Sequence, residues 1–78
     1  MTGTNNISAF IRNALQDYFD RLDGEKTSGV YCMVLKSVER PMLEIVMEEA
    51  KGNQTLAAEM LGINRNTLRR KLGDYDLL

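Results

Sequence analysis

The sequence contains no histidine and only one cysteine, Cys32, among its 78 residues. Without histidine a zinc finger is excluded in practice, and a single cysteine cannot form an internal disulfide. The chain also lacks a glycine-rich phosphate loop and a convergent nucleophile and base, so we expect no enzyme, no cofactor and no metal site. We interpret Cys32 as a small apolar filler rather than a reactive thiol.

Long hydrophobic runs are absent too. No stretch approaches the run of about 20 apolar residues that a membrane span needs. The polar N-terminus has no apolar segment followed by a cleavage site, as a signal peptide would. We therefore expect a cytoplasmic protein with no membrane partner.

Positive charge is scarce overall but concentrated in one segment. The net charge is −1, yet residues 1–50 carry −3, residues 51–72 carry +4 and residues 73–78 carry −2. Charges in solution are screened over about 10 Å, so the local cluster matters more than the total for a charged partner. The composition therefore still permits binding to a polyanion.

The basic segment Gly52–Leu72 reads as two short helices joined by a tight turn, the form of a helix-turn-helix. Asn53 is a suitable N-cap for the first helix, and Asn64 can cap the second. Gly62 supplies the positive φ that the turn between them requires. In the second helix, the apolar positions that we expect to face inward are Leu68 and Leu72, together with Ile63 in the turn.

The rest of the second helix is cationic. It carries Arg65, Arg69, Arg70 and Lys71, with no acidic residue between Asn64 and Leu72. Four like charges within seven residues repel one another, which folding does not require but a polyanion rewards. The pattern therefore predicts a nucleic-acid-binding helix.

The upstream half predicts an all-α fold. Residues 1–6 are polar and expected to be flexible, and apolar residues at helical spacing predict a helix over residues 7–22. Residues 30–50 predict a second helix, kinked at Pro41 or divided there into two helices; we favour one kinked helix, because no turn residues flank Pro41. Residues 7–50 would form a dimerisation region, because a helix that is apolar on more than one side needs a second subunit in so short a chain. The candidate core or dimer-interface residues are Phe10, Ala14, Tyr18, Phe19, Tyr31, Val34, Leu35, Val38, Met42, Ile45 and Val46.

The segments Gly52–Thr55, Met60–Arg65 and Thr67–Leu72 resemble the C-terminal half of the Fis (factor for inversion stimulation) family. The resemblance continues upstream through Ala14–Leu22, Tyr31–Leu35 and Val38–Met47, so that it covers residues 8–72. It implies a four-helix protomer with its helix-turn-helix in residues 51–78, assembled into an intertwined homodimer. It also implies a bacterial nucleoid-associated protein that bends double-stranded DNA at degenerate, A/T-centred palindromic sites and regulates transcription and DNA organisation.

The resemblance also suggests roles for individual residues. Arg65 would contact guanine O6 and N7, and Asn64 would contact a base edge or a phosphate. DNA backbone contacts would come from Asn53, Gln54, Thr55, Thr67, Arg69, Arg70 and Lys71. Two departures from the family pattern are Asn66, in place of a glycine, and the acidic tail Gly73–Leu78. We expect this tail either to weaken binding or to be held away from the phosphates.

Some partners and two rival interpretations stay open. RNA polymerase is a further candidate partner, whereas contact with a recombinase is not expected, because only residues 1–6 precede the first predicted helix. One rival is the DNA-binding domain of an enhancer-dependent activator, which shares the motif but would close a longer chain. The other is a helical protein–protein interaction module whose cations are merely solvated.

Overall fold

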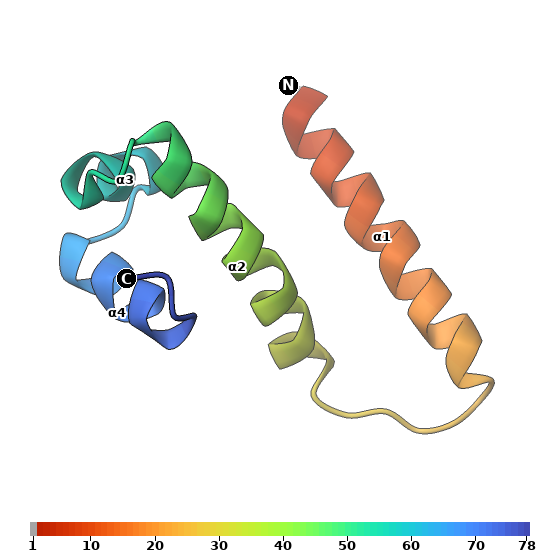
Figure 1. Cartoon of the computed structure of the whole chain (residues 1–78). Helices are drawn as coiled ribbons and strands as arrows, with labels where there is room; N and C mark the ends of the chain where they lie inside the picture. The colour runs from red at the N-terminus through yellow and green to blue at the C-terminus, as the bar shows by residue number, and fades with distance from the viewer. Residues whose placement is uncertain (1) are drawn as a thin grey trace. The chain divides into compact units, whose positions relative to one another are not determined.

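The computed structural model describes residues 2–78, with side chains from Asn6 onward. Over this range the chain folds into four helices: α1 (Thr2–Leu22), α2 (Val30–Glu49), α3 (Gln54–Leu61) and α4 (Arg65–Asp74) (Figure 1). The expected all-α class with four helices is thus confirmed. The chain divides into two compact units, residues up to 30 and residues 31–78, which are described separately below.

Helix α1 begins earlier than the sequence pattern predicts. It starts at Thr2 rather than at residue 7, so residues 2–6 of the predicted flexible N-terminus are helical, and Met1 lies outside the described residues. Apolar periodicity cannot detect this first turn and a half, because its residues are all polar. The helix ends as expected, since Asp23 and Gly24 both adopt positive φ (52° and 85°).

The linker after α1 is tied back onto the helix. The hydroxyls of Tyr18 and Thr27 share a hydrogen bond of 2.7 Å. The ring of Tyr18 also meets that of Phe19 edge to face, with centroids 5.4 Å apart. These contacts order the first unit locally.

Helix α2 runs without interruption through Pro41, so one helix is confirmed and two separate helices are excluded. A proline at this position cannot donate to the carbonyl four residues earlier, at Ser37. The Ser37 hydroxyl itself donates to the Met33 carbonyl (2.7 Å). The bend expected at Pro41 stays a prediction.

The turn between α2 and α3 uses two left-handed residues. Lys51 and Gly52 have φ of 55° and 81°, and the Gly52 N–H donates to the Met47 carbonyl (3.0 Å). This bond satisfies one of the carbonyls left over at the end of α2. Gly52 therefore ends α2 in the left-handed conformation, which glycine adopts without steric strain.

The buried core belongs to the second unit. Its members are Leu43, Ala50, Ala57, Ala58, Leu68 and Leu72, and partly buried apolar residues pack around them. Three leucines, one from α2 and two from α4, therefore form the core together with one alanine that follows α2 and two alanines on α3. The expectation that Leu68 and Leu72 face inward is confirmed, since both are fully buried.

The candidate core or interface residues of the upstream half lie outside this buried core. None of the eleven is fully buried in the single chain, and Val46 is the one among them that packs against the core cluster. The single chain therefore does not bury these residues as a core of its own, and their place in a dimer interface stays a prediction. Helical periodicity marks an apolar face but does not say which chain covers it.

Candidate nucleic-acid interface

The first helix of the motif is capped by Asn53. Its backbone is extended (φ −82°, ψ 105°), and its Oδ1 accepts a hydrogen bond from the Leu56 N–H (3.1 Å). The predicted N-cap is therefore confirmed. Because the oxygen is engaged, only the amide nitrogen of this side chain remains to donate to a phosphate.

Gly62 makes the turn between the two helices. Its φ of 76° is left-handed, and its N–H donates to the carbonyls of Ala58 (2.8 Å) and Glu59 (3.2 Å). The next residue, Ile63, also donates to the Ala58 carbonyl (3.1 Å) and packs against the core. These bonds close α3 and fix the direction in which α4 departs.

Asn64 caps α4 and places Arg65 at its first residue. The Asn64 Oδ1 accepts from the Asn66 N–H (2.7 Å), which confirms the second predicted cap. Arg65 is exposed and follows directly on this cap. The unpaired N–H groups of the first helical turn carry partial positive charge, which adds to that of the arginine.

The outward face of α4 is basic, while its inward face is apolar. Arg65, Arg69 and Arg70 are exposed, whereas Leu68 and Leu72 on the same helix are fully buried. Within residues 6–78, none of these arginines forms an ion pair with a carboxylate. The surface therefore presents three uncompensated guanidinium groups to solvent.

One contact joins the two helices of the motif across this surface. The Arg69 Nη1 donates to the Gln54 Oε1 over 3.4 Å, a long and therefore weak hydrogen bond. Gln54 is the first residue of α3, so the bond brings the start of one helix beside the middle of the other. Of the remaining predicted contacts, Thr55 is exposed and Thr67 is half-buried.

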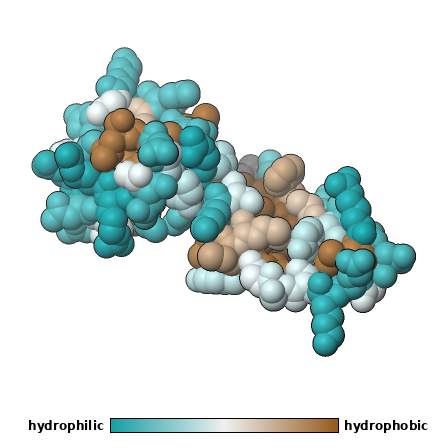
Figure 2. Space-filling view, turned by 60° about the horizontal axis from the view of Figure 1, so that its bottom comes forward, coloured by the Kyte–Doolittle hydropathy of each residue, from teal (hydrophilic) through white to brown (hydrophobic). Residues whose placement is uncertain are grey.

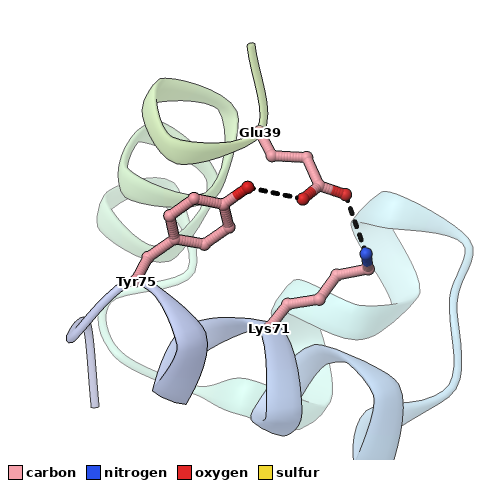
Figure 3. Close-up of polar contacts among 3 residues, drawn as sticks. All are labelled: Glu39, Lys71 and Tyr75. Carbon is pink, nitrogen blue, oxygen red and sulfur yellow. Dashed lines mark hydrogen bonds and ion pairs between the residues drawn. The ribbon is translucent and has the colours of Figure 1, made fainter. Parts of the chain in front are cut away.

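Lys71 lies elsewhere than on the outward face where the sequence pattern suggested it. Its Nζ donates to Glu39 Oε2 on α2 (2.7 Å), and the Tyr75 hydroxyl donates to the other oxygen, Oε1 (2.7 Å) (Figure 3). The side chains of Lys71 and Glu39 are only 30% and 23% exposed. We name Glu39, Lys71 and Tyr75 the carboxylate clamp.

The clamp perturbs its acidic groups in opposite directions. The hydrogen bond from Lys71, followed by that from Tyr75, lowers the pKa of Glu39 below its usual 4.5. The hydrogen bond to Glu39 raises the pKa of Tyr75 above its usual 10.0. Both shifts favour the charge state that the clamp needs, an ionised carboxylate facing a neutral phenol.

Glu39 was not among the residues that sequence reasoning selected. Its partners lie 32 and 36 positions away, so no local spacing links them. A weak signal did exist, because Lys71 directly precedes the buried Leu72 and follows the buried Leu68 by three positions. A lysine at the edge of an apolar stripe is placed to meet a neighbouring helix.

The chain after α4 turns back onto the core. Asp76 has a positive φ of 58°, and the Leu77 N–H donates to the Leu72 carbonyl (2.8 Å). Leu77 packs against the core, whereas Asp74 and Asp76 are exposed.

No helix within residues 2–78 has the length and hydropathy to cross a membrane.

Comparisons with known proteins agree on one family. Residues 34–75 match the family described as "Bacterial regulatory protein, Fis family". Over 74 residues, 95% of this chain and 96% of the relative, the sequence is 58% identical to a protein named as a Fis-like DNA-binding protein in Ralstonia nicotianae. It is 56% identical to a protein similarly named in Pseudomonas aeruginosa, over 87% of this chain and 65% of the relative. Identity to the DNA-binding protein Fis of Actinobacillus succinogenes is 52%, over 86% of this chain and 68% of that protein.

Proposed function

The chain belongs to the Fis family, and from this premise we propose that it binds double-stranded DNA as a homodimer, through the motif formed by α3, the Gly62 turn and α4. The family is one of DNA-binding regulators rather than of enzymes. The observation that carries the proposal is the row of three exposed arginines on α4 without a carboxylate partner within residues 6–78. A phosphate backbone would neutralise this row and release counterions.

In the proposed complex α4 enters the major groove with its N-terminal end foremost. Arg65 stands at that end, where a guanidinium can donate two hydrogen bonds to guanine O6 and N7. Asn64 lies beside it and has its amide nitrogen available, because its oxygen is engaged in the cap. These two residues are the proposed base contacts.

Phosphate contacts are proposed for the polar side chains around α4 and at the start of α3. Arg69 and Arg70 extend from the exposed face, and Asn53, Gln54, Thr55 and Thr67 supply shorter donors. The Arg69–Gln54 hydrogen bond supports a shared surface, since it links donors from both helices. Lys71 is left out of this set, because Glu39 already holds its ammonium group.

The proposed dimer accounts for the apolar faces of α1 and α2. In the single chain Phe10 is 71% exposed, Tyr31 79% and Ile45 56%. Hydrophobic side chains stand open at the surface among hydrophilic ones (Figure 2). Soluble proteins rarely leave such faces uncovered, and a second copy of the chain would cover them symmetrically. The proposed interface comprises the exposed and half-buried members of the candidate set given above.

A two-fold dimer would present two copies of α4 to one duplex. Following the family resemblance, we propose that the DNA bends to admit both and that an A/T-rich centre makes this bending less costly. Such a protein would be associated with the bacterial nucleoid in the cytoplasm and would act on transcription and DNA organisation.

The test is fluorescence-anisotropy binding to a short palindromic duplex with an A/T-rich centre and flanking guanines. A duplex with a G/C-rich centre is the comparison, and both are titrated over a salt series. We expect steeply salt-dependent binding that favours the A/T centre. Absence of binding at low salt would refute the proposal and favour a helical protein–protein interaction module.

The role of Arg65 is tested in the same assay. Arg65→Ala should cost about 1–3 kcal/mol on the preferred duplex and should reduce the preference for the flanking guanines. Arg12→Ala is the matched control, because it removes the same charge from an exposed position on α1. Equal losses of affinity for all duplexes would instead make Arg65 a phosphate contact.

A further inference from the structure

The carboxylate clamp joins α2 to the last turns of α4 and to Tyr75, which directly follows that helix. Both oxygens of Glu39 are engaged, one by Lys71 and one by Tyr75, each at 2.7 Å. Figure 3 shows the side chains of Lys71, on α4, and Tyr75, directly after that helix, pointing toward the same carboxylate. The next residue of α2, Arg40, donates to the backbone carbonyl of Tyr75 (2.7 Å). Two consecutive residues of α2 thus form three polar bonds to the end of α4.

The apolar contacts of α4 do not by themselves define its rotation. Within the helix, Leu68 and Leu72 are buried against the core along a narrow stripe, and Ile63, Tyr75 and Leu77 pack against it beyond the helix ends. Burial of apolar surface is non-directional, so a helix held in this way can roll by several degrees at little cost. Hydrogen bonds to a carboxylate are directional and strengthened by charge, so they resist that roll.

The rotation of α4 decides where its outward side chains point. Tyr75 lies ten residues after Arg65, about 15 Å along the helix axis. The Asn64 cap and the Gly62 turn fix the near end, and the clamp fixes the far end. If the helix is held at both ends, Arg65 meets a base edge in one orientation. If the helix can rotate about its axis, Arg65 meets the base edge in many orientations.

We infer that Glu39 is a positioning residue for DNA recognition: through Lys71 and Tyr75 it fixes the rotation of α4, and it keeps Lys71 off the phosphate backbone. This inference rests on the proposed function. Glu39 touches no DNA and acts through its two partners. Lys71 therefore helps to fix the orientation of α4, whereas Arg69 and Arg70 contribute the phosphate contacts.

Two measurements separate this role from a general effect on folding. A variant that only unfolds part of the protein binds all duplexes less well by the same factor. It therefore leaves unchanged both the ratio of affinities for preferred and unrelated duplexes and the slope of log affinity against log salt. Loss of positioning lowers the ratio, and each lysine or arginine that joins or leaves a phosphate changes the slope by about 0.9.

The first experiment measures both quantities for the full chain and for Glu39→Gln. We expect the affinity ratio to fall about five- to tenfold, because base discrimination depends on two well-aligned hydrogen bonds. The salt slope should steepen by about 0.9 per protomer, because Lys71 is released to reach a phosphate. Glu48→Gln is the matched control, since Glu48 is an exposed carboxylate on the same helix, and neither quantity should change.

The second experiment compares cations on α4. Lys71→Met should leave the salt slope unchanged, whereas Arg70→Met should make it shallower by about 0.9 per protomer. Tyr75→Phe removes one bond of the clamp and keeps the ring, so the affinity ratio should fall by less than in Glu39→Gln. A Lys71→Met slope as shallow as that of Arg70→Met would overturn the inference.

Reversal of the charges provides a rescue. Lys71→Glu alone sets two carboxylates against each other and should reduce the affinity ratio at least as far as Glu39→Gln. The double variant Glu39→Lys/Lys71→Glu restores opposite charges and should return the ratio to within about twofold of the wild-type value. Failure of the double variant to rescue, or an unchanged ratio in Glu39→Gln, would overturn the inference while Arg65-dependent binding still upheld the proposed function. A wild-type chain that binds no duplex would overturn both.

Discussion

Single residues in this protein serve local folding and, in the proposed complex, DNA binding as well. Asn53 and Asn64 each use the side-chain oxygen to cap a helix, and each retains an amide nitrogen at the surface. A cap contributes about 1 kcal/mol to stability, and it also sets the direction in which the helix begins. The two asparagines therefore place Gln54 and Arg65, the first residues of α3 and α4.

The carboxylate clamp makes stability depend on pH in a defined way. The folded-state pKa of Glu39 is below its usual 4.5, so its stabilisation is present above that pH and is lost as the pH falls through the folded-state value. The folded-state pKa of Tyr75 is above its usual 10.0, so its contribution is present below that pH and is lost as the pH rises through the folded-state value. The clamp should therefore stabilise the fold fully between about pH 5 and pH 9.

We predict that the difference in unfolding free energy between wild type and Glu39→Gln is constant over that range and shrinks toward zero in acid. Glutamine does not titrate, so the difference isolates Glu39 from the other carboxylates. Urea unfolding at a fixed protein concentration and a series of pH values measures it. A difference that persisted undiminished at pH 2 would show that the charge of Glu39 is not what stabilises the clamp.

Elements of this fold were predictable where the signal is local. The positions of α3 and α4 follow from two asparagine caps, one left-handed glycine and a pair of leucines four residues apart. The continuity of α2 through Pro41 follows from the lack of turn residues around it. Caps and turns act within a few residues, so one sequence suffices to recognise them.

The features that were not predicted depend on contacts between helices or on segments without a periodic apolar pattern. The first residues of α1 are polar and carry no periodic signal. The partner of Lys71 lies on another helix, 32 positions away. The burial of Leu43, rather than of its neighbour Met42, depends on which face of α2 meets the alanines around α3. Periodicity alone does not decide that face when a helix is apolar on more than one side.

The same substitution at two leucines should separate core from surface. Leu68 on α4 is fully buried and Leu56 on α3 is 41% exposed. Leu68→Ala should destabilise the fold by about 2–5 kcal/mol, because it leaves a cavity in a small core. Leu56→Ala has the same change in helix propensity and should cost under about 1 kcal/mol. Thermal unfolding followed by circular dichroism compares them; equal losses would contradict the burial described for α4.

At the scale of the whole molecule, charge and apolar surface are divided between regions. Residues 51–72 carry a net charge of +4 in a chain whose total is −1, and exposed apolar side chains crowd α1 and α2. In the proposed dimer the apolar faces would be covered and the basic faces would remain open. The total charge of the chain is therefore a poor guide to its partner.

The proposed dimer predicts a strong effect of Phe10, which is 71% exposed in the single chain. Burial of a phenylalanine is worth about 1.5–3 kcal/mol, and a two-fold dimer gains it twice, so Phe10→Gln should raise the dissociation constant about a hundredfold or more. Sedimentation equilibrium measures this constant. Arg12→Gln, two positions along α1, is the control and should change it little. A wild-type chain that sediments as a monomer at micromolar concentration would refute the dimer.

The compact position of the core along the chain has a kinetic consequence. Among the described residues, every fully buried side chain lies between Leu43 and Leu72. Contacts that are close in sequence require closure of only short loops, and helical proteins dominated by them fold in microseconds to milliseconds. The helix-turn-helix region should thus reach its native fold within a single chain, before two chains meet to form the proposed dimer at the low concentrations of early synthesis. Subunit encounter, rather than formation of the recognition surface, would then set the pace at which active protein accumulates.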